Sequence, residues 1–263
     1  MTCAISERLE FAKSIAFDAG TLAIQMRNER GYGFASQKSH QDFVTAADLA
    51  VEDLIRGRIL DRFPGDSILG EEQGSTGDSN SIWIVDPIDG TTNYMHGMPE
   101  WAVSIGYCND HSIQCGTIYA PDISTLVSAR AGQGSHVAAN SVEVSKCERI
   151  DNALVLLGRS ARHGTKDHLD NIGGLIASGV EYRRNGSAAY SLLAIATGRA
   201  EAFYEAHLNP WDAVAGILLV IEAAGQVDYP PLVDFLTQGG PVLASNTILH
   251  DDVRSAIFCA SGG

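Results

Sequence analysis

Positive charge is scarce in this 263-residue sequence. There are 18 Lys and Arg residues against 32 Asp and Glu, which gives a formal net charge of −14. Nucleic acids and anionic membrane surfaces are bound by basic faces, so this deficit argues against both as the main partner. We therefore expect neither a nucleic-acid partner nor a membrane partner.

Cysteine pairs and long apolar runs are also missing. The five cysteines are scattered, and no two have the CxxC spacing of a zinc or redox site: Cys3, Cys108, Cys115, Cys147 and Cys259. No window is apolar enough to cross a membrane, and residues 1–10 are polar and acidic without the apolar core of a signal peptide. The sequence predicts a protein of a reducing compartment, and we expect it in the cytoplasm.

The chain shows no 20–50-residue repeat, low-complexity tract or flexible Pro/Ser linker. Its 45% hydrophobic content is sufficient for a packed core. We expect one compact catalytic unit of two lobes, an N-terminal α+β lobe over residues 1–145 and a C-terminal α/β lobe over 146–263. Functional clefts often form where such lobes meet.

One long stretch, from Phe63 through Ala129, contains no Lys or Arg at all. It contains nine acids: Asp66, Glu71, Glu72, Asp78, Asp86, Asp89, Glu100, Asp110 and Asp122. Buried carboxylates without a partner cost several kcal/mol each unless they are protonated or bound to cations. If several of these acids converge, the sequence favours a bound metal. A solvated surface position is the alternative, expected above all for Asp78, Asp110 and Asp122.

Two of these acids lie in residues 83–93, WIVDPIDGTTN, around which the candidate chemistry is organised. The β-branched and aromatic start predicts a buried strand. Pro87 should end that strand at Asp86, so that Asp86 and Asp89 project from a stiff turn into one small volume. Gly90 allows close backbone approach to a ligand, and the following residues are typical of a helix start with free N–H groups. Cation-binding carboxylates would lie beside anion-binding amides.

A shorter strand over residues 67–72 ends in Glu71 and Glu72. Adjacent side chains of an extended segment point to opposite faces, so only one of the two should enter a given site. A hairpin-like pairing of this strand with residues 83–89 would bring Glu71 beside Asp86.

The remaining pattern predicts an antiparallel first half and an alternating second half. Helices are expected at 6–30 and from about 48 to 63, antiparallel strands at 102–107, 112–120 and 125–131, and alternating strands and helices from 153 to 257. Gly132-Gln133-Gly134 superficially resembles a nucleotide loop, but it lies between strands and predicts a hairpin turn.

The helix from about Asp212 to Ala224 is apolar nearly all round, so we expect it in the centre of the second layer. Asp212 stands at its start, where a carboxylate can cap the helix or serve as a metal ligand, and spacing leaves both open. Asp48 could likewise be a simple helix cap. Lys38, taken alone, indicates nothing.

Residues 83–94 resemble a signature of the inositol monophosphatase family, of the form WIIDPIDGTTNF, and residues 209–225 resemble its second signature, WDxAAGxxxxxEAGG. Further similarities lie at Gly70-Glu71-Glu72, at residues 42–48, and at residues 186–189 leading to Tyr204-Glu205. They follow the family's order and spacing over almost the whole chain.

The resemblance implies a layered αβαβα sandwich of the inositol monophosphatase and fructose-1,6-bisphosphatase type. It also implies a phosphomonoesterase with two or three Mg²⁺ ions, acting on inositol monophosphate or a related polyol phosphate. By this resemblance, the first ion would be held by Glu71, Asp86 and the carbonyl of Ile88, and the second by Asp86, Asp89 and Asp212. Such oxygen donors suit Mg²⁺ and disfavour zinc.

The resemblance assigns further roles around the metals. Glu71 would orient or deprotonate the attacking water, assisted by Thr91 hydrogen-bonded to Asp48, and Lys38 would add positive charge nearby. The residues expected to contact substrate are Asp89, Gly90, Thr91, Gly186, Ser187, Ala188 and Glu205. An alternative is that Asp86 or Asp89 is itself a nucleophile, as in aspartyl-phosphate enzymes.

Substrate choice depends on fewer residues. Thr92-Asn93 after Asp-Gly-Thr is the inositol-type pattern, and Glu205 matches a carboxylate that binds sugar hydroxyls, although a surface acid is the plain alternative. Residues 135–141 and 227–230 depart from the family pattern. Two alternatives stay open: a phosphatase for histidinol phosphate, a sugar phosphate or a nucleoside phosphate, and a regulatory or binding protein that retains the fold. The resemblance also implies a homodimer and sensitivity to lithium.

Overall fold

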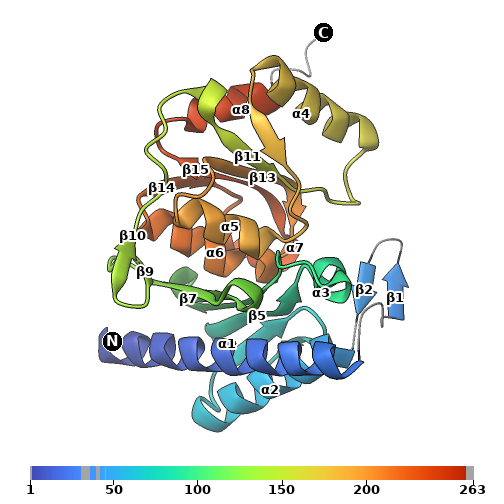
Figure 1. Ribbon diagram of the computed structural model, residues 1–263. Coiled ribbons are helices and arrows are strands. Elements are labelled where there is room, and N and C mark those ends of the chain that lie inside the picture. Colours follow the sequence, from blue (N-terminus) through green and yellow to red (C-terminus); the bar gives the residue numbers. More distant parts are fainter. Residues whose placement is uncertain (1, 31–35, 40–41, 45, 259–263) are drawn as a thin grey trace.

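The computed structural model describes residues 2–30, 36–39, 42–44 and 46–258, with side chains described over 4–29 and 46–258. Five layers are stacked in the molecule (Figure 1). Helices α1 (Thr2–Arg30) and α2 (Ala46–Arg62) form the first, and α5 (Ala188–Ala196) and α6 (Pro210–Glu222) form the third, between two sheets. Helices α4 (Thr165–Ala177) and α8 (His250–Phe258) form the last. This is the expected αβαβα sandwich.

The first sheet has eight strands in the order β10-β9-β8-β7-β6-β5-β3-β4. Their bounds are β3 (Ser67–Gly70), β4 (Gly74–Thr76), β5 (Ser81–Asp89), β6 (Ala102–Asn109), β7 (Ser112–Ala120), β8 (Thr125–Arg130), β9 (Ser135–Val137) and β10 (Asn140–Val142). From β5 to β10 each pair of neighbours is antiparallel, as the sequence predicts. Helix α3 (Thr91–His96) follows β5, and β1 (Ser36–Ser39) pairs with β2 (Asp42–Val44).

The expected hairpin between β3 and β5 is wrong. These strands are parallel neighbours, and β3 forms its hairpin with β4 instead. Parallel strands have their carboxyl ends at the same sheet edge, so Glu71 still reaches β5, where its backbone N–H donates to the carbonyl of Val85 at 3.2 Å. Strand β5 also continues past Pro87 to Asp89, with a register shift after Asp86 where the proline interrupts the pairing with β6.

Arginines from α1 neutralise two of the acids in the stretch without Lys or Arg. Arg8 pairs with Asp66 at 2.9 Å, and Arg27 pairs with Asp122 at 2.5 Å. The Trp101 indole also donates to Asp122 at 2.6 Å. Asp122 is an exposed residue, as expected, but its carboxylate is paired with Arg27. The sequence gives no sign of this pair because the helix that supplies the partner is almost a hundred residues away.

The second sheet has five strands in the order β12-β11-β13-β15-β14. Their bounds are β11 (Leu154–Leu157), β12 (Glu181–Arg183), β13 (Ala202–Leu208), β14 (Gly225–Asp228) and β15 (Gly240–Asn246), with α7 (Leu232–Gln238) before β15. Strand β11 is parallel to β12 and β13, whereas β15 is antiparallel to β13 and β14. The sheet is mixed, and α4 and α8 cover its outer face.

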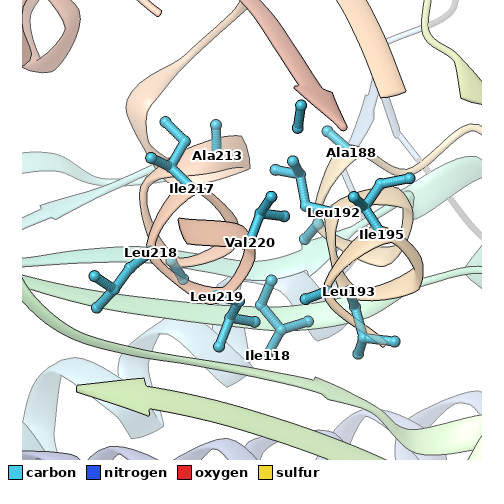
Figure 2. Close-up of a cluster of buried hydrophobic side chains, with 14 of the residues drawn as sticks. Ile118, Ala188, Leu192, Leu193, Ile195, Ala213, Ile217, Leu218, Leu219 and Val220 are labelled. Atoms are coloured by element: carbon cyan, nitrogen blue, oxygen red, sulfur yellow. The ribbon is translucent and has the colours of Figure 1, made fainter. Parts of the chain in front are cut away.

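Helices α5 and α6 fill the space between the sheets with aliphatic side chains (Figure 2). Two glycines of the first sheet allow α6 to approach closely: a Cβ on Gly106 would lie 2.9 Å from Val214, and one on Gly116 would lie 3.0 Å from the Cα of Ala215. The predicted burial of this helix is confirmed. The start of α6 is thereby held close to the strands that follow the Asp86–Asp89 turn.

The far end of α6 is bound by the predicted hairpin turn between β8 and β9. The Glu222 carboxylate accepts the backbone N–H groups of Gly132, Gln133 and Gly134 at 2.7, 3.0 and 2.8 Å. Successive N–H groups that face one point form an anion-binding concavity. The Gly132-Gln133-Gly134 turn therefore does bind an anion through its backbone N–H groups, as a nucleotide loop does, but the anion is the chain's own Glu222 carboxylate.

Candidate active site

Three carboxylates from two distant segments meet between the sheets. Asp86 and Asp89 stand at the end of β5, and Asp212 stands in the first turn of α6. One ligand oxygen from each residue lies within 4.8 Å of the others, a group that could hold a metal ion. The structure thus brings together the residues that the family resemblance assigns to one metal.

Hydrogen bonds hold the two β5 carboxylates in place. Asp86, only 1% exposed, accepts the backbone N–H of Ile88 at 3.0 Å. Asp89 accepts the Ser187 hydroxyl and the backbone N–H of Ala189, the latter at 2.6 Å, at the start of α5. These contacts restrict the side-chain torsions, so the cluster is formed by the fold itself.

Asp212 both caps helix α6 and lies in the acidic cluster, the two roles that its sequence position left open. Its carboxylate accepts the backbone N–H of Asn209 at 2.7 Å and closes a capping box at the start of α6. The same side chain lies in the cluster with Asp86 and Asp89. Helix capping therefore sets the rotamer that places this carboxylate between the sheets.

Burial and mutual repulsion raise the pKa values of these carboxyl groups. The pKa of Asp86 is raised well above 3.8 by burial and then by the charges of Glu71, Asp89, Asp212 and Asp48. Burial also raises the pKa of Asp89 to about 6, and burial with Asp89 raises that of Asp212 to about 7. A divalent cation relieves both costs, and an all-oxygen donor set fits Mg²⁺.

Glu71 lies at the turn between β3 and β4, within electrostatic range of Asp86. A buried carboxylate from α2 fixes this turn: Glu52, fully buried, accepts the backbone N–H groups of Glu72 at 2.8 Å and Gln73 at 3.1 Å. Residue 70 must be glycine to leave room for the Glu52 side chain, since a Cβ at position 70 would lie 2.4 Å from the Glu52 carboxylate.

Sequence reasoning missed Glu52, although a signal was present. Asp48, Glu52 and Arg56 are spaced by four residues and therefore lie on one face of α2. All three are buried, and the Arg56 guanidinium donates to Glu52 at 2.7 Å. Charged residues in a row on the buried face of a helix require partners, which here are the turn that contains Glu71 and the Thr91 hydroxyl.

Thr91 lies where the resemblance predicts. Its hydroxyl is 3.3 Å from a carboxylate oxygen of Asp48 and 3.2 Å from the carbonyl of Ile88, and it can donate to either. Gly90 before it has φ 92°, and a Cβ there would lie 3.0 Å from the Cβ of Ser187. A side chain at Gly90 would be strained and would also push the end of β5 away from the start of α5, where Ser187 is the N-cap.

Asn93 has a structural explanation that the sequence did not suggest. It is 7% exposed, and its amide donates to the carbonyls of Glu100 and Asn185, both at 2.6 Å. It therefore joins α3 to the loop that leads into α5. Thr92 beside it is exposed.

A polar pocket adjoins Asp89 and Asp212. Five of the seven residues expected to contact substrate line it: Asp89, Gly186, Ser187, Ala188 and Glu205. Burial, with the charges of Asp212 and Asp89, raises the pKa of Glu205 to about 8 against the opposing effect of Arg184. A Cβ on Gly158 would lie 1.9 Å from the Glu205 carboxylate, so glycine is needed there. Glu205 thus faces the pocket, which argues against a plain surface position.

The structure also locates the remaining acids and basic residues considered in the sequence. Asp78 and Asp110 are exposed, as expected. Lys38 lies in β1, but its side chain lies outside the described residues. Two pocket arginines, Arg159 and Arg184, were not expected from the sequence. In the described part of the chain, no helix has the length and apolar character needed to cross a membrane.

Known proteins share this architecture and sequence. Residues 4–257 match the sequence model of the inositol monophosphatase family. The chain is 33% identical over 256 residues to the Nus factor SuhB of Xylella fastidiosa, covering 94% of this chain and 93% of that one. It is 34% identical over 269 residues to inositol monophosphatase 1 of Homo sapiens, with coverages of 95% and 94%.

A solved structure extends the similarity to the fold. The crystal structure of extragenic suppressor protein suhB from Bartonella henselae superposes with a TM-score of 0.89 at 30% identity, covering 96% of this chain and 98% of that one. The match spans both sheets and all the segments that meet at the acidic cluster. This chain belongs to the inositol monophosphatase family.

Proposed function

We propose that the chain is a Mg²⁺-dependent phosphomonoesterase that hydrolyses inositol monophosphate or a closely related polyol phosphate. The observation that supports this proposal is the cluster of Asp86, Asp89 and Asp212 beside a polar pocket that contains Glu205. The family membership and the relative named inositol monophosphatase 1 point to the same chemistry.

The proposed site holds two or three Mg²⁺ ions. Asp86, Asp89 and Asp212 would bind one ion, and Glu71, Asp86 and the carbonyl of Ile88 would bind another. When bound, Mg²⁺ supplies positive charge that stabilises the phosphoryl oxygens and lowers the pKa of water. The buried, mutually repelling carboxylates described above suit that charge.

The chain's own groups would then orient the reactants. The Glu71 carboxylate orients the attacking water and accepts its proton, while the Thr91 hydroxyl, held by Asp48, fixes the approach of that water. The backbone N–H groups of Gly90 and Thr91 bind the phosphoryl oxygens at the start of α3. Lys38 is assigned an accessory charge by the resemblance alone.

The pocket residues would select the alcohol part of the substrate. Glu205 accepts hydrogen bonds from substrate hydroxyls, and Gly186 and Ala188 contact its carbon skeleton. The Ser187 hydroxyl is engaged by Asp89, so its part is to orient that carboxylate.

Phosphate release from a panel of phosphomonoesters, with and without Mg²⁺, tests the proposal. The panel contains inositol 1-phosphate, histidinol phosphate, a sugar phosphate and a nucleoside phosphate. We expect Mg²⁺-dependent release, fastest from the inositol ester. A stronger preference for another ester would overturn the substrate assignment alone, and no release from any ester would overturn the enzyme assignment. Trapping a phosphoaspartate at Asp86 or Asp89 would replace direct hydrolysis with the covalent alternative.

A second candidate function comes from relatives that carry the name Nus factor SuhB. It is a regulatory or binding role that retains the fold, and it becomes the better account if the whole panel is inert. The homodimer, lithium sensitivity, cytoplasmic location and the division into lobes 1–145 and 146–263 stay predictions.

A further inference from the structure

A chain of polar contacts leads from an exposed loop to Asp212. The loop of residues 158–164 follows β11, and Arg162 on this loop reaches the end of β13 and the start of α6. The Arg162 guanidinium contacts the His207 ring and donates to the side-chain oxygen of Asn209 at 3.4 Å. Asn209 in turn donates to the carboxylate of Asp212. The proposed hydrolysis assigns no part to Arg162, His207 or the Asn209 side chain.

The His207 ring serves as the acceptor for Arg162. Its Nδ1 lies 3.0 Å from the backbone carbonyl of Leu208, which can only accept, so Nδ1 carries the proton. Nε2 then accepts from the guanidinium of Arg162, which can only donate. Burial and, after it, the charge of Arg162 lower the pKa of His207, in agreement with a neutral ring. His207 therefore holds the guanidinium beside Asn209 without adding a second positive charge.

The Asn209 amide lies between a group that only donates and a group that only accepts. Arg162 has no acceptor, and the ionised Asp212 carboxylate has no donor. The amide oxygen therefore faces Arg162, and the amide nitrogen donates to Oδ2 of Asp212 at 3.2 Å. The Asn209 backbone N–H donates to the same oxygen at 2.7 Å. Because both donors end on Oδ2, the carboxylate can offer its other oxygen to a cation.

The charge of Arg162 by itself acts against a cation at this site. Arg162 lies within electrostatic range of Asp212, where it opposes the rise in the pKa of that carboxyl group. The same charge repels a cation held by Asp89 and Asp212. If Arg162 acted through its charge alone, removing it from the protein with ionised carboxylates should tighten Mg²⁺ binding. If Arg162 holds Asn209 in place, removing it should weaken Mg²⁺ binding, so the two roles predict opposite signs.

We propose that Arg162 and Asn209 are positioning residues for Asp212, the candidate metal ligand on α6. Asn209 holds one oxygen of the carboxylate, and Arg162 holds the Asn209 amide in the orientation that this contact requires. The inference rests on the proposed Mg²⁺ site and deepens it by two residues. It also makes the loop of residues 158–164 part of the metal site, because the position of this loop decides whether Arg162 reaches Asn209.

Calorimetric titration of the metal-free protein with Mg²⁺ at about pH 8.5 tests the inference. At this pH, proton competition at Asp212, whose pKa is raised to about 7, is small. Asn209→Ser keeps a good N-cap residue for α6 but is too short to reach from Arg162 to Asp212, so it should weaken Mg²⁺ binding about tenfold or more. Arg162→Gln should weaken Mg²⁺ binding about threefold, because contacts of an exposed side chain contribute less.

A double variant shows whether Arg162 acts through Asn209. In the Asn209→Ser background, Arg162→Gln should cause no further weakening, since the amide that it holds is gone. Arg183→Gln is the matched control, because Arg183 is also exposed but pairs with Glu181, and its Mg²⁺ affinity should equal that of the wild type. Melting curves of the metal-free variants check that each is folded. If Asn209→Ser does not fold, the sign of the Arg162→Gln effect decides alone.

These measurements separate the inference from the proposed function. Weaker Mg²⁺ binding in both single variants, with no additional loss in the double variant, supports the inference even if no ester is hydrolysed. Unchanged or tighter binding by Arg162→Gln, or additive losses in the double variant, would overturn the inference while hydrolysis continues. Absence of Mg²⁺ binding by the wild type would overturn the inference together with the proposed metal site.

Discussion

Glu52 provides the sharpest test of how the fold places Glu71. Its carboxylate is fully buried and binds two backbone N–H groups of the turn that contains Glu71, together with the guanidinium of Arg56. Glu52→Ala removes the acceptor of all three hydrogen bonds at once. Glu52→Gln keeps the shape of the side chain, but it removes the charge and turns an NH₂ group toward N–H donors that need an acceptor.

The magnitudes follow from these contacts. Removing one partner of a buried ion pair costs about 3–5 kcal/mol, so Glu52→Ala should lower the free energy of unfolding by that amount. This is a large part of the roughly 5–15 kcal/mol that a protein has in total. Glu52→Gln should lower it by about 1–3 kcal/mol. Because the turn then loses its anchor, a displacement of Glu71 by about 1 Å should lower kcat about 100-fold.

The assay combines urea unfolding with Mg²⁺-dependent phosphate release, both measured on folded variants. Asp53→Asn is the matched control, because Asp53 is the next residue of α2 and accepts a hydrogen bond from Gln73 at 2.7 Å on the exposed side. The control should unfold within about 0.5 kcal/mol of the wild type and keep its activity. The reasoning fails if Glu52→Gln matches this control in both stability and kcat.

Three further predictions concern the acidic cluster and the pocket. Burial raises the pKa of Asp89 to about 6 and of Asp212 to about 7, above the 3.8 of an unfolded chain, so their destabilisation is absent below about pH 3.8 and complete above about pH 7. These two groups should therefore lower the melting temperature of the metal-free protein progressively as the pH rises from about 3.8 to about 7. Mg²⁺ should raise the melting temperature more at pH 7.5 than at pH 5. Equal increases at the two pH values, measured by calorimetry, would contradict this. Asp89→Asn should lower turnover at least about 100-fold while the metal-free protein melts no lower than the wild type, and retained activity would mean that Asp89 is not a ligand. Gly158→Ala should displace Glu205, since a Cβ would lie 1.9 Å from its carboxylate, and should raise KM for polyol phosphates with an unchanged circular dichroism spectrum.

The parts of this protein that were predicted correctly are those with local causes. In residues 83–93 an apolar run is followed by two acids that flank a proline, and then by a glycine, so Asp86 and Asp89 could be placed together from sequence, although β5 continues to Asp89 instead of ending at Asp86. Helix α6 is apolar on every side, which a helix can be only in the middle of a layered fold. Asp212 could therefore be put near the centre, although the choice between cap and cluster needed the structure, which shows both.

The parts that were missed depend on which segments become neighbours. Strand β4 intervenes after β3, so β3 and β5 are parallel although a short polar loop favoured a hairpin. Two acids of the stretch without Lys or Arg, Asp66 and Asp122, pair with arginines of α1, and no local sequence pattern indicates these pairs. Arg159 and Arg184 were overlooked for the same reason: each is an ordinary surface arginine until β11 and the loop before α5 form one pocket wall.

The contact between Glu222 and the hairpin turn has a mechanical consequence for the acidic cluster. Helix α6 is a stiff rod of about 20 Å, with Asp212 near one tip and Glu222 at the other. Sliding of this rod along the first sheet would break three hydrogen bonds at Glu222 before it moved Asp212 by a single residue's rise. The position of the Asp212 carboxylate along the axis of α6 is thus fixed by a turn at the opposite end of the central layer. Changes in the 132–134 loop should therefore change the distance between Asp212 and Asp89.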